Sequence, residues 1–145
     1  MMSICNLGDF QDHTTLSQNP GLLRVLQVFD GISSHPRPSK GEAAVRQHLI
    51  EVAQAQGWSV EKDGTGNVAI RVPATPGKEQ SMPVILQGHM DIVVTPSDRD
   101  LPRIAEIVDQ GQEGEEKGLW MQTRGRTMTL GSDNGIGVSL AMAAM

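Results

Sequence analysis

The sequence is poor in cysteine, in aromatic residues and in clustered positive charge. Its 145 residues include one cysteine, Cys5, so no disulfide can form within the chain, and a reducing compartment is the natural setting. It has two Trp, two Phe and no Tyr, so a core would consist mainly of aliphatic residues and Met. The net charge is −5 and no block of Lys or Arg occurs, which argues against a nucleic-acid partner or an anionic membrane surface.

Long apolar runs are also absent. The first 20 residues are polar and lack the continuous apolar region of a signal peptide, and no stretch approaches the ~20 apolar residues of a membrane span. We therefore expect a soluble, cytoplasmic protein. The length suits a single ordinary domain, a hydrophobic content of 38% is adequate for a core, and 16 Gly and 8 Pro predict many turns.

The hydrophobic pattern predicts an α/β fold. Residues 1–18 show little pattern and are expected to form a flexible arm. Apolar residues at helical spacing predict a helix over 19–30, capped by Asn19, and another over 39–56. A Ser-x-x-Glu capping box from Ser39 to Glu42 is expected to open the second helix.

Alternating apolar residues predict the strands. Two neighbouring strands are expected over 58–62 and 67–72, joined by a turn. Shorter strands are expected at 119–122 and 127–130, whereas residues 102–108 fit a strand or a turn of helix equally well. Residues 138–145 are expected to begin an apolar helix.

The stretch 84–94 holds the first candidate site residues. Val84, Ile85 and Leu86 form an apolar run that predicts a buried strand, and His89 and Asp91 follow it two residues apart. Alternate side chains of an extended chain point the same way, so these two can face one site. An imidazole beside a carboxylate suits half of a metal centre. The alternative is a structural histidine, since most His-x-Asp triplets are incidental.

A second candidate lies in the Gly-rich turn at 131–137. Asp133 sits there between a predicted strand and a predicted helix, where α/β proteins place ligand groups. Its two carboxylate oxygens suit a bridge between two metal ions, which lie ~3.5–4 Å apart in hydrolytic sites. The alternative is that Asp133 caps the helix that follows, which is a common role for Asp.

Other polar residues are weaker candidates. His13 lies in the arm, His35 lies in a Pro-rich loop, and His48 is expected to be a half-buried helix residue. The acidic residues at 98–100 lack the later ligands of a Ca²⁺ loop, and those at 113–116 form a charge run typical of a solvated loop. The chain has no P-loop and no Gly-x-Ser-x-Gly elbow.

Two motifs together resemble the di-zinc aminopeptidase and dipeptidase family. Residues 86–91 read Leu-Gln-Gly-His-Met-Asp, and residues 130–137 read Leu-Gly-Ser-Asp-Asn-Gly-Ile-Gly. The second motif is closest to that of the aminoacyl-histidine dipeptidases, which are bacterial cytosolic enzymes. The resemblance covers residues 20–145. It implies that residues 19–145 are the N-terminal part of a zinc-peptidase catalytic domain, with a mixed sheet flanked by helices, and that the dimerisation domain and the rest of the catalytic domain are absent.

The resemblance also implies a role for each candidate. His89 would bind zinc, Asp91 would serve catalysis by orienting His89 and raising its basicity, and Asp133 would bridge two zinc ions. Cobalt or manganese are alternatives to zinc. A water molecule between the metals would lose its proton to a glutamate and attack the carbonyl of a dipeptide substrate, of the Xaa-His type. The full-length protein would be a homodimer.

One departure from the family pattern bears on activity. The family's glutamate belongs to a Glu-Glu pair after the bridging aspartate, but residues 134–145 contain no Glu, and Glu115 and Glu116 precede Asp133. We therefore expect the isolated chain to be inactive, to hold zinc weakly and to expose apolar surface. Two alternatives remain open, namely a non-catalytic module that binds metal or a partner, and an unrelated α/β domain in which Asp133 is a helix cap.

Overall fold

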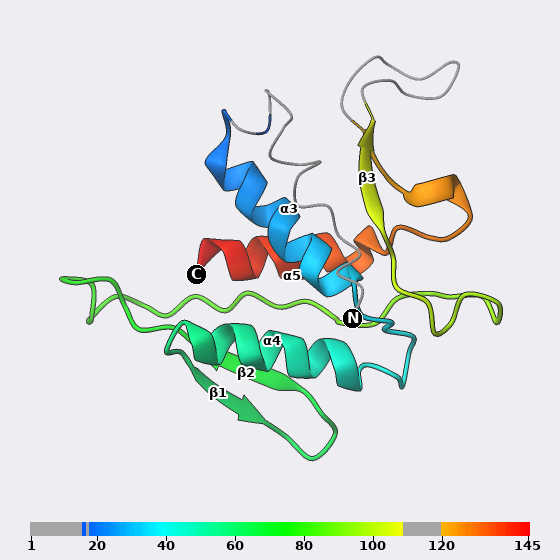
Figure 1. The fold of residues 1–145 in the computed structure, drawn as a ribbon. Helices are drawn as coiled ribbons and strands as arrows, with labels where there is room; N and C mark the ends of the chain where they lie inside the picture. The colour runs from blue at the N-terminus through cyan, green and yellow to red at the C-terminus, as the bar shows by residue number, and fades with distance from the viewer. Residues whose placement is uncertain (1–15, 17, 109–119) are drawn as a thin grey trace.

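The computed structural model describes residue 16, residues 18–108 and residues 120–145 (Figure 1). The predicted arm at 1–18 lies almost wholly outside these residues, and so do Cys5, His13, Glu115 and Glu116. The described elements combine helices with strands, which confirms the α/β class. They are α3 (Pro20–Ser33), α4 (Ala43–Ala55), β1 (Ser59–Lys62), β2 (Val68–Arg71), β3 (Ala105–Val108), β4 (Trp120–Thr123), the 3-10 helix η1 (Arg124–Arg126) and α5 (Ser132–Ala144).

Helix α3 begins where the sequence predicts. The side chain of Asn19 accepts a hydrogen bond from the backbone N–H of Leu22 at 3.1 Å, and Pro20 occupies the first turn, where a missing N–H costs nothing. The helix continues past Gly31 because Ile32 and Ser33 are buried in its last turn. None of the helices in the described part of the chain is long and apolar enough to cross a membrane.

The capping box predicted for α4 is wrong. The Ser39 hydroxyl donates instead to Asp91 Oδ2 at 2.5 Å, and Glu42, at the N-cap position, makes no side-chain hydrogen bond to the helix. Glu42 Oε1 accepts from the backbone N–H of Lys40 at 2.6 Å. The hydroxyl of Ser39, which the local pattern assigns to the start of the helix, therefore donates to the distant carboxylate of Asp91.

The strands form two separate antiparallel sheets. In the first, β1 pairs with β2 as predicted, with Val60 opposite Ile70. In the second, β3 pairs with β4, so residues 105–108 are a strand. Within the described residues these sheets do not join into the single mixed sheet that was expected, and parallel pairing appears as an isolated bridge between Pro38 and Ile92. No strand forms at 127–130.

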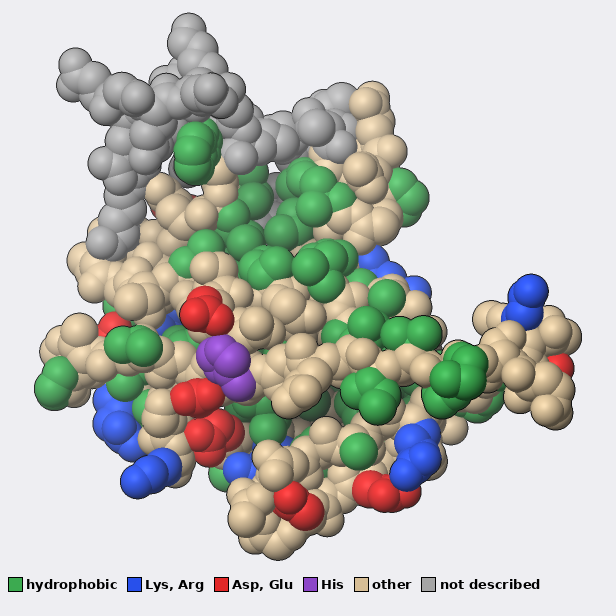
Figure 2. Space-filling view, turned by 180° about the vertical axis from the view of Figure 1, so that it is seen from behind, with side chains coloured by type: hydrophobic (Ala, Val, Ile, Leu, Met, Phe, Trp, Pro, Cys, Tyr) green, Lys and Arg blue, Asp and Glu red, His purple; other side chains and the backbone are tan. Residues whose placement is uncertain are grey.

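The buried strand predicted at 84–86 is also wrong. Val84 and Ile85 are 83% and 88% exposed, and the stretch belongs to neither sheet. In Figure 1 this drawn-out segment crosses between a layer that holds α3 and α5 and a layer that holds α4 with the β1–β2 hairpin. Figure 2 shows hydrophobic side chains gathered across one face of the molecule. The expected exposed apolar surface is thus present along this segment.

The core lies on both sides of α3. One cluster packs α3 against α5 and the β3–β4 sheet around Phe29, and the other joins α3, α4 and α5 to the hairpin around Val45. Phe29 and Val45 are fully buried. Helices α3 and α5 therefore pack together beside the candidate site. Asp133 lies in the first turn of α5, and His89 and Asp91 lie in the extended segment.

Candidate metal centre

His89 follows the extended segment, and its ring is about half exposed to solvent. Its Nδ1 atom lies 3.0 Å from the backbone oxygen of Asp91 and 3.1 Å from Asp91 Oδ1. Its Nε2 atom lies 3.1 Å from Asp133 Oδ1, although the two residues are 44 positions apart. The structure therefore brings together all three residues that the sequence analysis singles out.

Hydrogen bonds set the ionisation of this cluster. Partial burial lowers the pKa of His89, but the bonds to Asp133 and Asp91 outweigh that effect, and the net result is a raised pKa. The hydroxyl of Ser39 donates to the Asp91 carboxylate and lowers the pKa of Asp91, and His89 adds to this effect. An ionised Asp91 accepts the Nδ1 proton of His89, which leaves Nε2 as the nitrogen available to a proton or a metal ion.

The donor atoms fit zinc. Imidazole nitrogen and carboxylate oxygen bind zinc at about 2.0–2.2 Å, so two donors on one tetrahedral ion lie roughly 3.3 Å apart. The separation of 3.1 Å between His89 Nε2 and Asp133 Oδ1 matches that spacing. The Asp133 side chain is 90% exposed, so its other oxygen is open to a second ion.

The donor set is nevertheless incomplete. Across residues 16, 18–108 and 120–145, no three His, Cys, Asp or Glu side chains gather in a group that could hold a metal ion. A closed zinc site takes four ligands and a catalytic site takes three from the protein. The described residues therefore supply part of a metal centre.

The first turn of α5 directs Asp133 toward His89. Gly131 precedes the turn with φ 72° and ψ 28°, a left-handed conformation that suits glycine. Asp133 and Asn134 then depart from helical geometry, and the peptide bond between them is cis. No side chain caps the start of the helix, so Asp133 faces His89 and is not a helix cap.

The chain before His89 packs directly on that turn. A Cβ atom added at Gly88 would lie 2.6 Å from Asn134 Oδ1 and 3.0 Å from Val138 Cγ2. A larger residue at position 88 would have to displace the side chain of Asn134, so glycine lets the two segments lie in contact. This contact holds His89 within reach of Asp133.

Sequence reasoning missed two residues that support the cluster, Ser39 and Arg37. Ser39 holds Asp91 through the hydrogen bond described above, and its only local signal pointed to a helix cap. The buried Arg37 donates to the backbone oxygens of Met90 and Gly131. No local pattern marks it, because both acceptors are backbone atoms far along the chain.

Replacing Ser39 by alanine will raise the pKa of Asp91 toward its ordinary value. The variant removes the hydrogen bond that contributes most to stabilising the ionised carboxylate. The measurement is an NMR titration of the Asp91 carboxyl carbon. Ser34→Ala is the matched control, because the Ser34 hydroxyl donates to Gly31 O within α3 at 2.7 Å. An unchanged Asp91 pKa in Ser39→Ala would contradict the assigned bond.

Two further histidines among the described residues, His35 and His48, lie in a separate pair. His48 is half-buried in α4, as predicted, and its ring centroid lies 4.7 Å from that of His35. Desolvation lowers the pKa of His48, and the nearby His35 contributes in the same direction. These two rings contact each other and make no contribution to the candidate metal centre.

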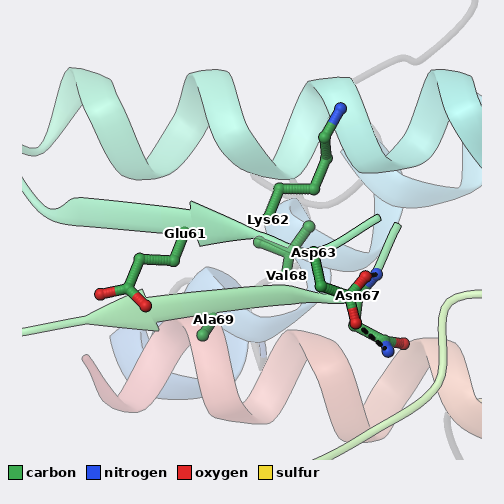
Figure 3. A pocket seen from close by; sticks show the side chains of 6 residues that line it. All are labelled: Glu61, Lys62, Asp63, Asn67, Val68 and Ala69. Atoms are coloured by element: carbon green, nitrogen blue, oxygen red, sulfur yellow. Dashed lines mark hydrogen bonds between the residues drawn. The ribbon is translucent and has the colours of Figure 1, made fainter. Parts of the chain in front are cut away.

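Two surface hollows differ in their relation to the cluster. One of about 290 Å³ lies on the β1–β2 hairpin, beside Asp63 and Asn67 (Figure 3). The Asp63 carboxylate is engaged by its own turn, since hydrogen bonds from the side chains of Asn67 and Thr65 and from nearby backbone N–H groups lower its pKa to about 2. The other hollow, of about 210 Å³, lies beside Asp133 and is lined by Ile92, Val93 and residues 129–133. The second hollow thus adjoins the candidate centre.

Comparison with known proteins shows that the chain is a homologue of dipeptidases, which confirms the predicted resemblance. It is 36% identical over 118 residues to the cytosol non-specific dipeptidase of Escherichia coli (strain K12), a match that covers 81% of this chain. It is 35% identical to the aminoacylhistidine dipeptidase of Vibrio alginolyticus, whose crystal structure matches 92% of this chain with a TM-score of 0.69. No protein-family model matches. The chain spans 23% and 26% of the lengths of these two relatives.

Proposed function

We propose that this chain contributes part of the zinc centre of a dipeptidase that hydrolyses dipeptides, including those of the Xaa-His type. His89 and Asp133 are the zinc ligands, with Asp133 able to bridge two ions, and Asp91 orients His89. The observation that carries this proposal is the fixed triad of Asp91, His89 and Asp133, with its 3.0–3.1 Å contacts. The names of both relatives support the reaction class, and the name of the E. coli relative supports a cytosolic location.

Each of the three residues has a separate task. Asp91 accepts the proton on Nδ1, fixes the tautomer of the imidazole and makes Nε2 a better donor. Asp133 has two carboxylate oxygens, and one of them, Oδ1, faces His89. When bound, zinc lowers the pKa of water to about 7 and polarises the carbonyl that is attacked. The hollow beside Asp133 is the position that this proposal gives to the substrate.

The isolated chain should hold metal weakly and hydrolyse no dipeptide. Two direct donors in the described residues cannot close a catalytic zinc site, and the family's general base has no counterpart after Asp133. In a complete dipeptidase the remaining ligands and the base come from elsewhere, and the assembly is a homodimer. Cobalt or manganese can replace zinc, because nitrogen and oxygen donors accept several metals.

The second candidate function is a non-catalytic module that binds a metal ion or a protein partner. The exposure of Val84 and Ile85 favours it, because an exposed apolar stretch is typical of an interaction surface. The two functions differ in one result. A catalytic part restores hydrolysis when the missing donors are supplied, and a binding module does not.

A chimera supplies those donors. This chain replaces the aligned segment of the E. coli cytosol non-specific dipeptidase, with which it shares 36% identity, and hydrolysis of a Xaa-His dipeptide is measured with added zinc. We expect zinc-dependent hydrolysis by the chimera and none by the isolated chain. A chimera that has the circular dichroism of the parent enzyme and binds zinc, yet hydrolyses nothing, would overturn the proposed catalytic role.

A further inference from the structure

Arg37 is buried in the loop between α3 and α4, with 1% of its surface exposed. Among the described residues its guanidinium forms no ion pair with a carboxylate. It donates hydrogen bonds to two backbone oxygens instead. Nη1 donates to Met90 O at 3.1 Å, and Nη2 donates to Gly131 O at 2.8 Å. Desolvation lowers the pKa of Arg37 to about 10, with the charge of Arg103 contributing, so the side chain remains charged at neutral pH.

The two oxygens belong to the two segments that carry the candidate metal ligands. Met90 lies between His89 and Asp91, and Gly131 lies two residues before Asp133. The backbone of the same loop also joins the first segment, since the N–H of Ile92 donates to Arg37 O at 3.0 Å. The Arg37 side chain thus bridges the segment that carries His89 and the segment that carries Asp133, two residues that are 44 positions apart.

The surroundings of the guanidinium are close-packed. A Cβ atom added at Gly131 would lie 2.8 Å from Nη2, and one added at Gly135 would lie 2.6 Å from the same atom. Both glycines therefore leave room for the guanidinium at the start of α5. The planar fork of arginine places two donors at a fixed angle, which the single ammonium of a lysine cannot reproduce.

We propose that Arg37 is a positioning residue that sets the separation of His89 and Asp133 by holding the Met90 and Gly131 carbonyls on one guanidinium. This inference rests on the proposed function for its relevance to zinc, but the positioning itself concerns the metal-free chain. A purely structural role would instead be like that of Arg103, which is equally buried. Arg103 donates to Asp98 O, Leu101 O and Asp98 Oδ2, all within its own loop.

Crystal structures of the metal-free variants test the positioning. In Arg37→Lys, one carbonyl loses its donor, so we expect the distance between His89 Nε2 and Asp133 Oδ1 to exceed the present 3.1 Å. In the matched control Arg103→Lys, we expect that distance to be unchanged. If Arg37→Lys does not fold, Arg37→Gln decides the question, because its shorter side chain lacks the planar fork that places donors on both carbonyls. An unchanged separation in whichever Arg37 variant folds would overturn the inference.

Cobalt binding to the same proteins separates this inference from the proposed function. Calorimetry and the visible spectrum of Co²⁺ should show weak binding to the original chain that His89→Gln removes. We expect Arg37→Lys to weaken that binding at least about tenfold, the size of effect seen when the support of a metal ligand is lost, and Arg103→Lys to leave it unchanged. Binding that does not depend on His89 would overturn the proposed function. Binding that depends on His89 but is equal in the two lysine variants would overturn the role of Arg37.

Discussion

Replacing His89 by glutamine in the chimera will lower kcat/KM at least about a thousandfold. A metal ion contributes several kcal/mol to stabilising a hydrolytic transition state, and each 1.36 kcal/mol corresponds to about tenfold in rate. Glutamine removes the imidazole nitrogen that faces Asp133. The measurement is steady-state hydrolysis of a Xaa-His dipeptide, with the bound zinc of each variant determined in parallel.

Asp91→Asn in the same chimera should have a smaller effect, of about 10–100-fold, because Asp91 acts through His89 and does not touch the metal. His48→Gln is the matched histidine control and should leave hydrolysis unchanged, since His48 contacts His35 and not the candidate metal centre. A loss from Asp91→Asn that equals or exceeds the loss from His89→Gln would reverse the assigned roles. Full zinc content in His89→Gln would likewise contradict the assignment of His89 as a zinc ligand.

Replacing Phe29 by alanine will cost the isolated chain about 3–5 kcal/mol of its free energy of unfolding. Phe29 is fully buried and lies in the cluster with Leu26 and Ala105. Domains of this size unfold with about 5–15 kcal/mol, so the loss removes a large share of the stability of the variant. The measurement is urea denaturation followed by circular dichroism.

Ile85→Ala is the control for this prediction, because Ile85 is equally apolar but 88% exposed. We expect its effect on the free energy of unfolding to stay within about 0.5 kcal/mol. A loss from Ile85→Ala that approaches the loss from Phe29→Ala would show that residues 84–86 are buried in solution. Such burial would contradict the exposure of the segment.

Features with local causes could be predicted from the sequence. Asn19 and Pro20 mark the start of α3 because a cap and a first-turn proline act within a few residues. The β1–β2 hairpin follows from two alternating segments joined by a tight turn, which Asp63 closes through hydrogen bonds to its own neighbours. His89, Asp91 and Asp133 could be predicted because the motifs at 86–91 and 130–137 together match one family pattern, although neither motif is specific alone.

Features that depend on distant partners could not be predicted. The Ser39 hydroxyl has two acceptors of similar chemistry, Glu42 nearby and Asp91 far along the chain, and only the folded structure decides between them. An apolar run such as 84–86 has the same local pattern whether or not other strands cover it. The role of Arg37 is hidden for a third reason, because backbone oxygens carry no sequence signature.

The bonds that Arg37 and Ser39 make also bear on the order in which the chain folds. They join residues 53, 94 and 52 positions apart, whereas the hairpin closes within a dozen residues. Closing a longer loop costs more chain entropy, and structures dominated by distant contacts form more slowly. The metal centre is therefore expected to form after the hairpin, once α3, α5 and the segment between them have come together, and a partly folded chain can keep its hairpin while having no centre at all.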